Sequence, residues 1–340
     1  MKFAHQRGIA IVPALLVATL AVTMVSGLFW RQQVQLRTIE NDRLTLQAHW
    51  VALGALDWGQ RILQEDARTS AADHLGEPWA AGQPASRLEG YLGVNRGEPE
   101  TAQSFMSSSI VDAQSFFNMS NLVSERQPNP LEMEAFRHLL ASLNLDPALA
   151  QGVAAALAAT QKGAAPQSAA PPPKQLSEAD KENMSVAEIR EWEAAQAAAA
   201  DTPASIGPAS ARLLQLDDLM HQPGFSPEVI EKLRTHAIFL PKPTPLNANT
   251  AGAQAIAAVL GKDLGSATQL VAARKQAWFR DEADLALRSG VPANPARASI
   301  KSHYFLVQSQ VRIGRADLQL QALIERGDDG KTRVAWVRET

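Results

Sequence analysis

The strongest constraint on this chain is an uncharged apolar stretch next to its N-terminus. Residues 9–30 read IAIVPALLVATLAVTMVSGLFW, 22 residues with no acidic or basic side chain. As an α-helix the stretch would be roughly 33 Å long, about the thickness of the hydrocarbon core of a bilayer. Lys2 and Arg7 precede it. Because positive charge is retained on the cytoplasmic side, we expect one membrane pass, with the N-terminus in the cytoplasm and the bulk of the chain outside it.

A cleaved secretory signal peptide is the alternative interpretation of this stretch. Its apolar core would have about 7–15 residues and would end at a small-x-small cleavage site, whereas the helical pattern here continues well beyond Trp30. Residues 32–68 contain no proline. We therefore expect a retained anchor and one helix from Ile9 to about Arg68, whose second half docks on a soluble domain. The apolar residues expected to form the docking stripe are Leu46, Trp50, Leu53, Leu56, Ile62 and Leu63.

Composition excludes several classes of function. The 340 residues are enough for two domains and an anchor. A net charge of -3 provides no general basic field to attract nucleic acid. The chain has no cysteine, which excludes disulfides, thiolate catalysis and cysteine-based zinc sites.

The middle of the chain alternates between a linker and helical segments. Gln161 to Pro173 is rich in Ala, Gln and Pro, which is typical of a linker. A polar, Ala-rich helix over Ser185 to about Ala199 is either solvated or binds a partner, and we favour the first. Residues 247–287 then resemble a helix-hairpin-helix unit. Its expected signals are Thr250 as the cap of helix 251–260, Gly261 after that helix, Ser266 as the cap of a second helix and Asp281 as the cap of a third.

A helix-hairpin-helix can bind DNA, because the backbone N–H groups of its hairpin hold a phosphate. The hairpin here reads GKDLG over residues 261–265, and Asp263 would repel a phosphate. The nearby cations Lys262, Arg274, Lys275 and Arg280 are offset by Asp281, Glu282 and Asp284. We therefore favour a protein-packing module and expect no nucleic acid partner.

The C-terminal region predicts three antiparallel strands. Phe305 to Ile313, Leu318 to Ile324 and Thr332 to Arg338 alternate between apolar and polar residues, with Gly/Asp-rich turns between them. One face of this sheet is expected to pack on the second half of the long helix.

No catalytic residue and no metal site are expected. The sequence has no nucleophile elbow, P-loop, zinc-protease or dinucleotide motif. The seven histidines are scattered without the spacing of metal ligands on a helix.

The first residues resemble a type IV prepilin leader. Gln6-Arg7-Gly8 is followed at once by the apolar run that begins at Ile9. In that family a prepilin peptidase cuts after the glycine, here between Gly8 and Ile9, and leaves the apolar helix in place for assembly. The resemblance makes Pro13, Leu16 and Leu20 part of this assembly helix. Most members carry glutamate at the position of Pro13.

The lack of that glutamate is typical of the minor pseudopilin K family of type II secretion systems (general secretion pathway protein K), which this chain resembles. Further similarity to that family lies in residues 32–60, 112–123, 147–157, 247–251 and 302–305. The family implies a non-enzymatic subunit at the tip of the periplasmic pseudopilus, anchored in the inner membrane and methylated. It implies minor pseudopilins of the I, J and H types and the prepilin peptidase as partners. A calcium site of some members cannot be mapped onto this sequence, so no cofactor is expected.

Two alternatives stay open at this point. One is a membrane-anchored periplasmic DNA-binding protein with a helix-hairpin-helix, and the other is a minor pilin of a type IV pilus. The predicted fold class is α+β, a pilin-like long helix packed on an antiparallel sheet with a large all-α (helix-hairpin-helix or SAM-like) insertion. The expected segments are a leader (1–8), a transmembrane helix (9–30), its amphipathic continuation (31–68), the first part of the pilin-like body (69–120), two helical subdomains (121–160 and 213–295) joined by a linker (161–212), and the closing strands (296–340).

Overall fold

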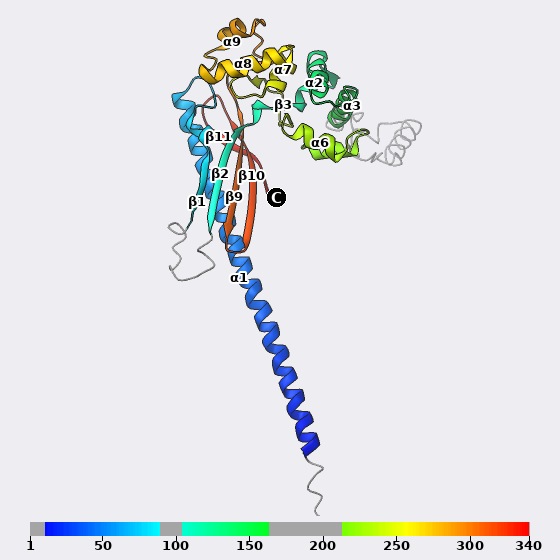
Figure 1. Ribbon diagram of the computed structural model, residues 1–340, viewed down its shortest axis with the longest axis vertical. Coiled ribbons are helices and arrows are strands. Elements are labelled where there is room, and N and C mark those ends of the chain that lie inside the picture. The colour runs from blue at the N-terminus through cyan, green and yellow to red at the C-terminus, as the bar shows by residue number, and fades with distance from the viewer. Residues whose placement is uncertain (1–10, 89–103, 163–212, 340) are drawn as a thin grey trace, which may run out of the picture. The chain divides into compact units, whose positions relative to one another are not determined.

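A computed structural model describes residues 11–88, 104–162 and 213–339 (Figure 1). Contacts divide the chain into two compact units. The first unit comprises residues 1–69, 76–111 and 305–340, and the second comprises residues 70–75 and 112–304. The predicted helix over residues 185–199 and most of the predicted linker lie outside the described residues. The finer division into eight segments stays a prediction.

The first unit consists of one long helix and a five-stranded sheet. Helix α1 runs without interruption from Ile11 to Thr69, which confirms the predicted continuous helix over the described residues. The strand order in the sheet is β1-β2-β9-β10-β11. The elements of this unit after α1 are η1 (Pro78–Ala81), β1 (Gln83–Arg87), β2 (Phe105–Asp112), β9 (Tyr304–Ile313), β10 (Ala316–Arg326) and β11 (Thr332–Glu339). Strands β9, β10 and β11 confirm the predicted closing strands, and β10 pairs antiparallel with β11.

The second half of α1 packs on one face of this sheet, while its first half extends past the strands (Figure 1). Alternate residues of β9 face the helix, among them the fully buried Phe305 and Val307. The predicted docking stripe was partly wrong. The helix buries Leu44, Ala48, Ala52, Leu56 and Leu63, whereas Leu46 and Trp50 are 57% and 65% exposed. Small side chains let the helix approach the strands closely, so the contact face follows the alanines and not the largest residues.

Gly59 shows how close this approach is. A Cβ atom at Gly59 would lie 3.1 Å from Cγ2 of Val307. Glycine inside a helix costs about 0.5–1 kcal/mol relative to alanine. Close contact with β9 accounts for its presence here.

The second unit is mostly helical. Its core joins residues from all its larger helices, including Phe136, Leu139, Ile230, Val259 and Phe279. Its helices are α2 (Pro130–Ser142), α3 (Leu149–Lys162), α6 (Pro227–Arg234), α7 (Ala253–Leu260), α8 (Leu264–Gln276) and α9 (Glu282–Ser289). The short 3₁₀ helices η3 (Ala113–Ser115) and η4 (Met119–Leu122) precede α2, and η5 (Leu216–His221) lies between α3 and α6. The remaining short strands are β3 (Phe117–Asn118) with β6 (Ala237–Ile238), β4 (Val123–Ser124) with β5 (Gln127–Pro128), and β7 (Leu246–Asn247) with β8 (Ala298–Ser299).

The helix caps in this unit agree with the predictions from the sequence at some positions and differ from them at others. Asp281 caps α9 by accepting a hydrogen bond from Asp284 N, and Gly261 ends α7 in the left-handed conformation with φ 63°, so both predictions are confirmed. Thr250 does not cap α7, because the N-cap is Gly252. Ser266 does not cap α8. The cap is Asp263, which accepts from Ser266 N, so the hairpin is shorter than predicted and Gly265 already belongs to α8.

Polar side chains from residues 114–121 bind the backbone that leads into β7. Asn118 Nδ2 donates to Lys242 O at 2.8 Å, and its Oδ1 accepts from Leu240 N at 3.2 Å. The side chain of Asn121 makes two bonds with the backbone of Thr244, at 2.8 and 3.0 Å. These buried or half-buried amides replace a regular sheet as the connection between segments far apart in the chain.

Thr250 belongs instead to a buried network around Asp112. Oδ2 of Asp112 accepts hydrogen bonds from Thr250 Oγ1 at 2.5 Å, from Ser302 Oγ at 2.7 Å and from Asn247 Nδ2 at 2.9 Å. Oδ1 of Asp112 accepts from Gln114 N at 2.8 Å. Burial is the main cause that raises the pKa of Asp112 to about 6, against the lowering effect of the two hydroxyls.

The first prediction concerns a donor of this network. Thr250→Val removes one hydroxyl from a buried carboxylate and should lower the free energy of unfolding by about 1–3 kcal/mol. The matched control is Thr268→Val, because the Thr268 hydroxyl is exposed and donates only to Leu264 O. Thermal unfolding of the two variants measures the difference, and equal losses would contradict the assigned role of the network.

The second prediction follows from the pKa of Asp112. Its folded-state pKa lies above its ordinary value of 3.8, so the folded state binds a proton more tightly between about pH 4 and pH 6. The contribution of Asp112 to the free energy of unfolding therefore falls as pH rises through this window, by up to about 3 kcal/mol. Asp112→Asn cannot titrate. The difference in unfolding free energy, wild type minus variant, should decrease from pH 4 to pH 7, and a constant or growing difference would refute the assignment.

Candidate functional site

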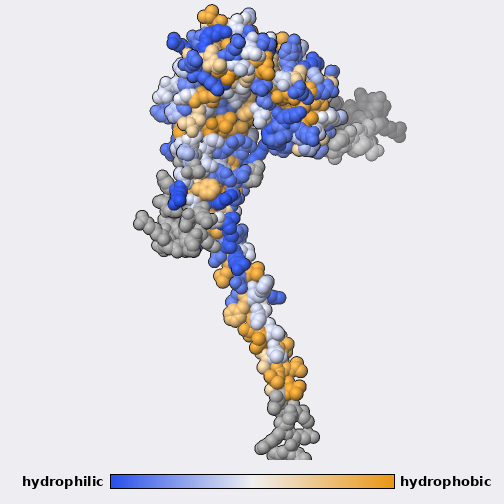
Figure 2. All heavy atoms as spheres, viewed as in Figure 1, coloured by the Kyte–Doolittle hydropathy of each residue, from blue (hydrophilic) through white to orange (hydrophobic). Residues whose placement is uncertain are grey.

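The first half of α1 exposes a continuous apolar surface. Figure 2 shows it as the orange part of the rod. Large apolar side chains are exposed along it from Val12 to Trp30, and further ones follow at Val34, Leu36 and Ile39. Soluble surfaces rarely carry an apolar area of this size. In the part of the chain that the structure describes, α1 is the one helix long and apolar enough to cross a membrane, with a mean hydropathy of 2.1 over 18 residues. The helix suits membrane anchoring.

The predicted site residues fall in two groups. Gly8 and Ile9, the expected cleavage point, lie outside the described residues. Pro13, Leu16 and Leu20 lie on α1, and all three are exposed. Pro13 is the third described residue of α1. The role of these residues in processing and assembly stays a prediction.

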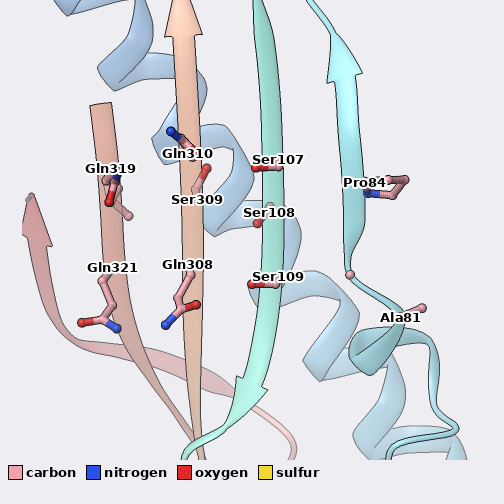
Figure 3. A pocket seen from close by; sticks show the side chains of 12 residues that line it. Ala81, Pro84, Ser107, Ser108, Ser109, Gln308, Ser309, Gln310, Gln319 and Gln321 are labelled. Carbon is pink, nitrogen blue, oxygen red and sulfur yellow. The ribbon is translucent and has the colours of Figure 1, made fainter. Parts of the chain in front are cut away.

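The outer face of the sheet carries a shallow groove of about 660 Å³ (Figure 3). Its lining residues are uncharged and come from η1 and from four neighbouring strands, among them Pro84 on β1. Ser107 and Ser109 lie on β2, Gln308 and Gln310 on β9, and Gln319 and Gln321 on β10. Amides and hydroxyls can form hydrogen bonds but supply no general acid or base near neutral pH.

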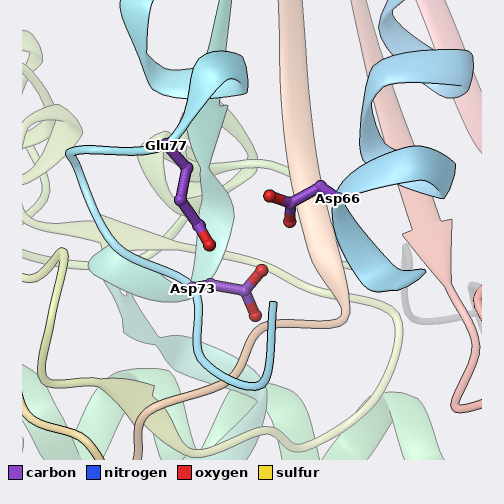
Figure 4. Close-up of side chains that lie close together, drawn as sticks. All are labelled: Asp66, Asp73 and Glu77. Atoms are coloured by element: carbon purple, nitrogen blue, oxygen red, sulfur yellow. The ribbon is translucent and has the colours of Figure 1, made fainter. Parts of the chain in front are cut away.

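Figure 4 labels three buried carboxylates, of which Asp66 on α1 and Glu77 next to η1 belong to the first unit. Asp66 Oδ2 accepts from Arg326 Nη1 at 2.9 Å, in an ion pair with both side chains buried. Glu77 Oε2 accepts from Trp79 Nε1 at 2.7 Å. The third carboxylate, Asp73, belongs to the second unit and accepts from Ser302 N at 2.7 Å. Each of them therefore has a donor within its own unit.

The hairpin between α7 and α8 is poorly suited to a phosphate. Asp263 accepts from Ser266 N at 2.9 Å and from Ser266 Oγ at 2.6 Å. The bonds from Ser266 lower the pKa of Asp263, so a negative charge already occupies the N-terminus of α8. Arg274 is only 7% exposed, and its Nη1 donates to Ala248 O at 2.5 Å. Burial lowers its pKa to about 10, and its guanidinium is not presented to a phosphate backbone.

The sequence missed one surface on α1. Leu36, Ile39, Leu46 and Trp50 are exposed beyond the apolar stretch that ends at Trp30. The spacing of these four residues along the helix is the signal for this surface. Two of them, Leu46 and Trp50, are instead predicted by the sequence analysis to contact the sheet.

Comparison with known proteins places the chain in a family. Models of "Type II secretion system (T2SS), protein K" match residues 115–242 and 246–304, together more than half of the chain. The type II secretion system protein K of Pseudomonas aeruginosa is 28% identical over 342 residues, which cover 97% of this chain and 91% of that protein. The protein of the same name from Aeromonas hydrophila is 24% identical and covers 96% of this chain and 95% of its own length.

The fold is also similar to a solved structure. A chain in the crystal structure of the GspK-GspI-GspJ complex from the type 2 secretion system of enterotoxigenic Escherichia coli matches with a TM-score of 0.53. The match covers 87% of this chain and 96% of that chain, at 18% identity. This likeness supports the α+β fold of a long helix on an antiparallel sheet with a helical insertion. With the family models and the relatives along the whole length, it follows that the chain belongs to the type II secretion system protein K family.

Proposed function

We propose that this protein is a minor pseudopilin at the tip of the type II secretion pseudopilus and takes part in protein secretion as a structural subunit without enzymatic activity. The observation that carries the proposal is the helix α1, whose first half is bare and apolar while its second half is fixed to a sheet. Such a helix can leave a membrane and pack among parallel helices without a change in the folded body.

The proposed partners are the other minor pseudopilins of the same system, of the I, J and H types. The support comes from the GspK-GspI-GspJ complex, which contains the similar chain. The prepilin peptidase is the proposed processing enzyme, and the inner membrane is the proposed location. The leader with Lys2 and Arg7 favours a cytoplasmic N-terminus and a periplasmic body.

Two features support a place at the tip. Pro13 stands where a carboxylate would need a neutralising neighbour, and a buried carboxylate in a membrane is costly without one. The second unit, residues 70–75 and 112–304, is a large helical body that would hinder the addition of further subunits. A minor pilin of a type IV pilus is the remaining alternative, and the genes next to this one would distinguish the two systems.

The third prediction tests processing at the leader. Co-expression with a prepilin peptidase should produce a membrane-extracted protein whose N-terminal sequence starts at Ile9, and Gly8→Ala should retain Met1. The control is Gly27→Ala in the same helix, where an added Cβ would have no heavy atom within 4 Å, so cleavage should be unchanged. An uncut wild-type chain, or a start beyond Trp30, would contradict the proposal.

The fourth prediction concerns the DNA-binding alternative. Because Asp263 and the buried Arg274 leave no phosphate site at the hairpin, the full chain in detergent should give no mobility shift of duplex DNA even at low salt. Affinity for DNA that weakens steeply with added salt would support the DNA-binding alternative instead.

A further inference from the structure

Beyond the apolar stretch, α1 has two opposite apolar faces. One face packs on the sheet through Leu44, Ala48, Ala52 and Leu56. Trp50 lies two residues from both alanines, which is about 200° around a helix. The second face carries the residues that we call the outer stripe, namely Leu36, Ile39, Arg43, Leu46 and Trp50, all of them exposed. At about 100° per residue they fall within a sector of roughly 80°.

Lipid cannot cover the outer stripe. The apolar stretch that ends at Trp30 already accounts for about one hydrocarbon thickness, and Trp50 lies roughly 30 Å further along the helix. The sheet occupies the opposite face. Four large apolar side chains, each 57–65% exposed, therefore face water in the isolated chain, which marks a surface for another protein.

The spacing of the residues in the outer stripe indicates that its partner is a helix. Steps of three and four residues alternate from Leu36 through Trp50, which is the a/d seam of a coiled coil. The same register extends backwards through the polar Gln32 to Phe29 and Val25, which are exposed within the apolar stretch. A seam that continues from the apolar stretch into the stripe suits one partner helix that runs alongside α1 in both, parallel to it.

Arg43 indicates whether the partner helix belongs to a second copy of this chain or to a different chain. It is exposed in the middle of the stripe, and within the described residues its guanidinium forms no ion pair, whereas its neighbour Glu40 pairs with Arg315 at 3.1 Å. In a parallel pair of identical helices the two Arg43 side chains would meet at one a position and repel. A helix with a carboxylate at the facing position would be attracted instead.

We propose that the outer stripe docks one parallel helix of a different pilin-type subunit, and that Arg43 selects a subunit whose helix presents a carboxylate opposite it. This inference rests on the proposed function, because it names the surface and the selectivity of a partner contact within the pseudopilus tip.

The experiment uses the full chain, co-expressed with the I-type or the J-type pseudopilin of the same system and extracted in detergent. Arg43→Glu should weaken co-purification with one of them at least about tenfold. The matched control is Arg37→Glu on the same helix, about 120° away from Arg43, which should leave co-purification unchanged. Each acidic residue in the first helix of the affected partner is then changed to Lys in turn, and one change should restore binding to Arg43→Glu.

Crosslinking gives a second measurement, which is clean because the chain has no cysteine. With single cysteines along the partner helix, Ile39→Cys should form a mixed disulfide, whereas Val34→Cys, exposed on the other side of α1, should not. Three outcomes would overturn this inference and leave the proposed function intact. They are equal co-purification of Arg43→Glu and Arg37→Glu in an intact complex, equal crosslinking at Ile39→Cys and Val34→Cys, and homodimers as the main product. If the wild-type chain captures neither pseudopilin, the proposed function itself fails.

Discussion

The close packing of α1 on the sheet is the contact on which the other features of the first unit depend. Ala48 and Ala52 are fully buried, and Gly59 lies against Val307, so backbone and strand approach as closely as side chains allow. Leu56 and Leu63 add about 1.5–3 kcal/mol each by burial. The pair of Asp66 and Arg326 closes the end of the helix. A pair of buried charges contributes little net stability against a good apolar replacement, but losing one partner would be costly, so it holds the last turns of the helix against β10.

The second unit is held together by a different kind of contact, namely hydrogen bonds of buried side chains. Its connecting segments include only two-residue strands, which cannot hold the helices by ladder hydrogen bonds. The Asp112 network, together with Asn118 and Asn121, joins these segments by side-chain bonds to hydroxyls, amides and backbone. Such bonds are directional, so they specify one arrangement, and burial makes an unmade bond expensive. The same burial leaves the Asp112 carboxylate easier to protonate.

Sequence reasoning succeeded where a local pattern determines the structure and failed where a distant contact does. The helix over residues 11–69, the three closing strands and the Asp281 cap follow from periodicity and local hydrogen bonds. Thr250 was predicted to cap a helix because its type and position fit a cap. Its hydroxyl instead donates a hydrogen bond to the carboxylate of Asp112, 138 residues away. Leu46 and Trp50 were predicted to contact the sheet because they recur with the other apolar residues along the helix. The position of the strands determines that the alanine face of α1 packs on the sheet. The larger residues therefore stay exposed and form the outer stripe.

The contact between α1 and the sheet also has a mechanical consequence. Leu44 and Leu63 mark the ends of the buried face, which is roughly 29 Å long, and the strands run alongside the helix (Figure 1). A force that pulls the membrane end of α1 along its axis therefore loads this whole contact in shear. The buried side chains resist together and do not peel apart one after another. A helix anchored in this way can be drawn out of a bilayer while the body that it carries stays folded.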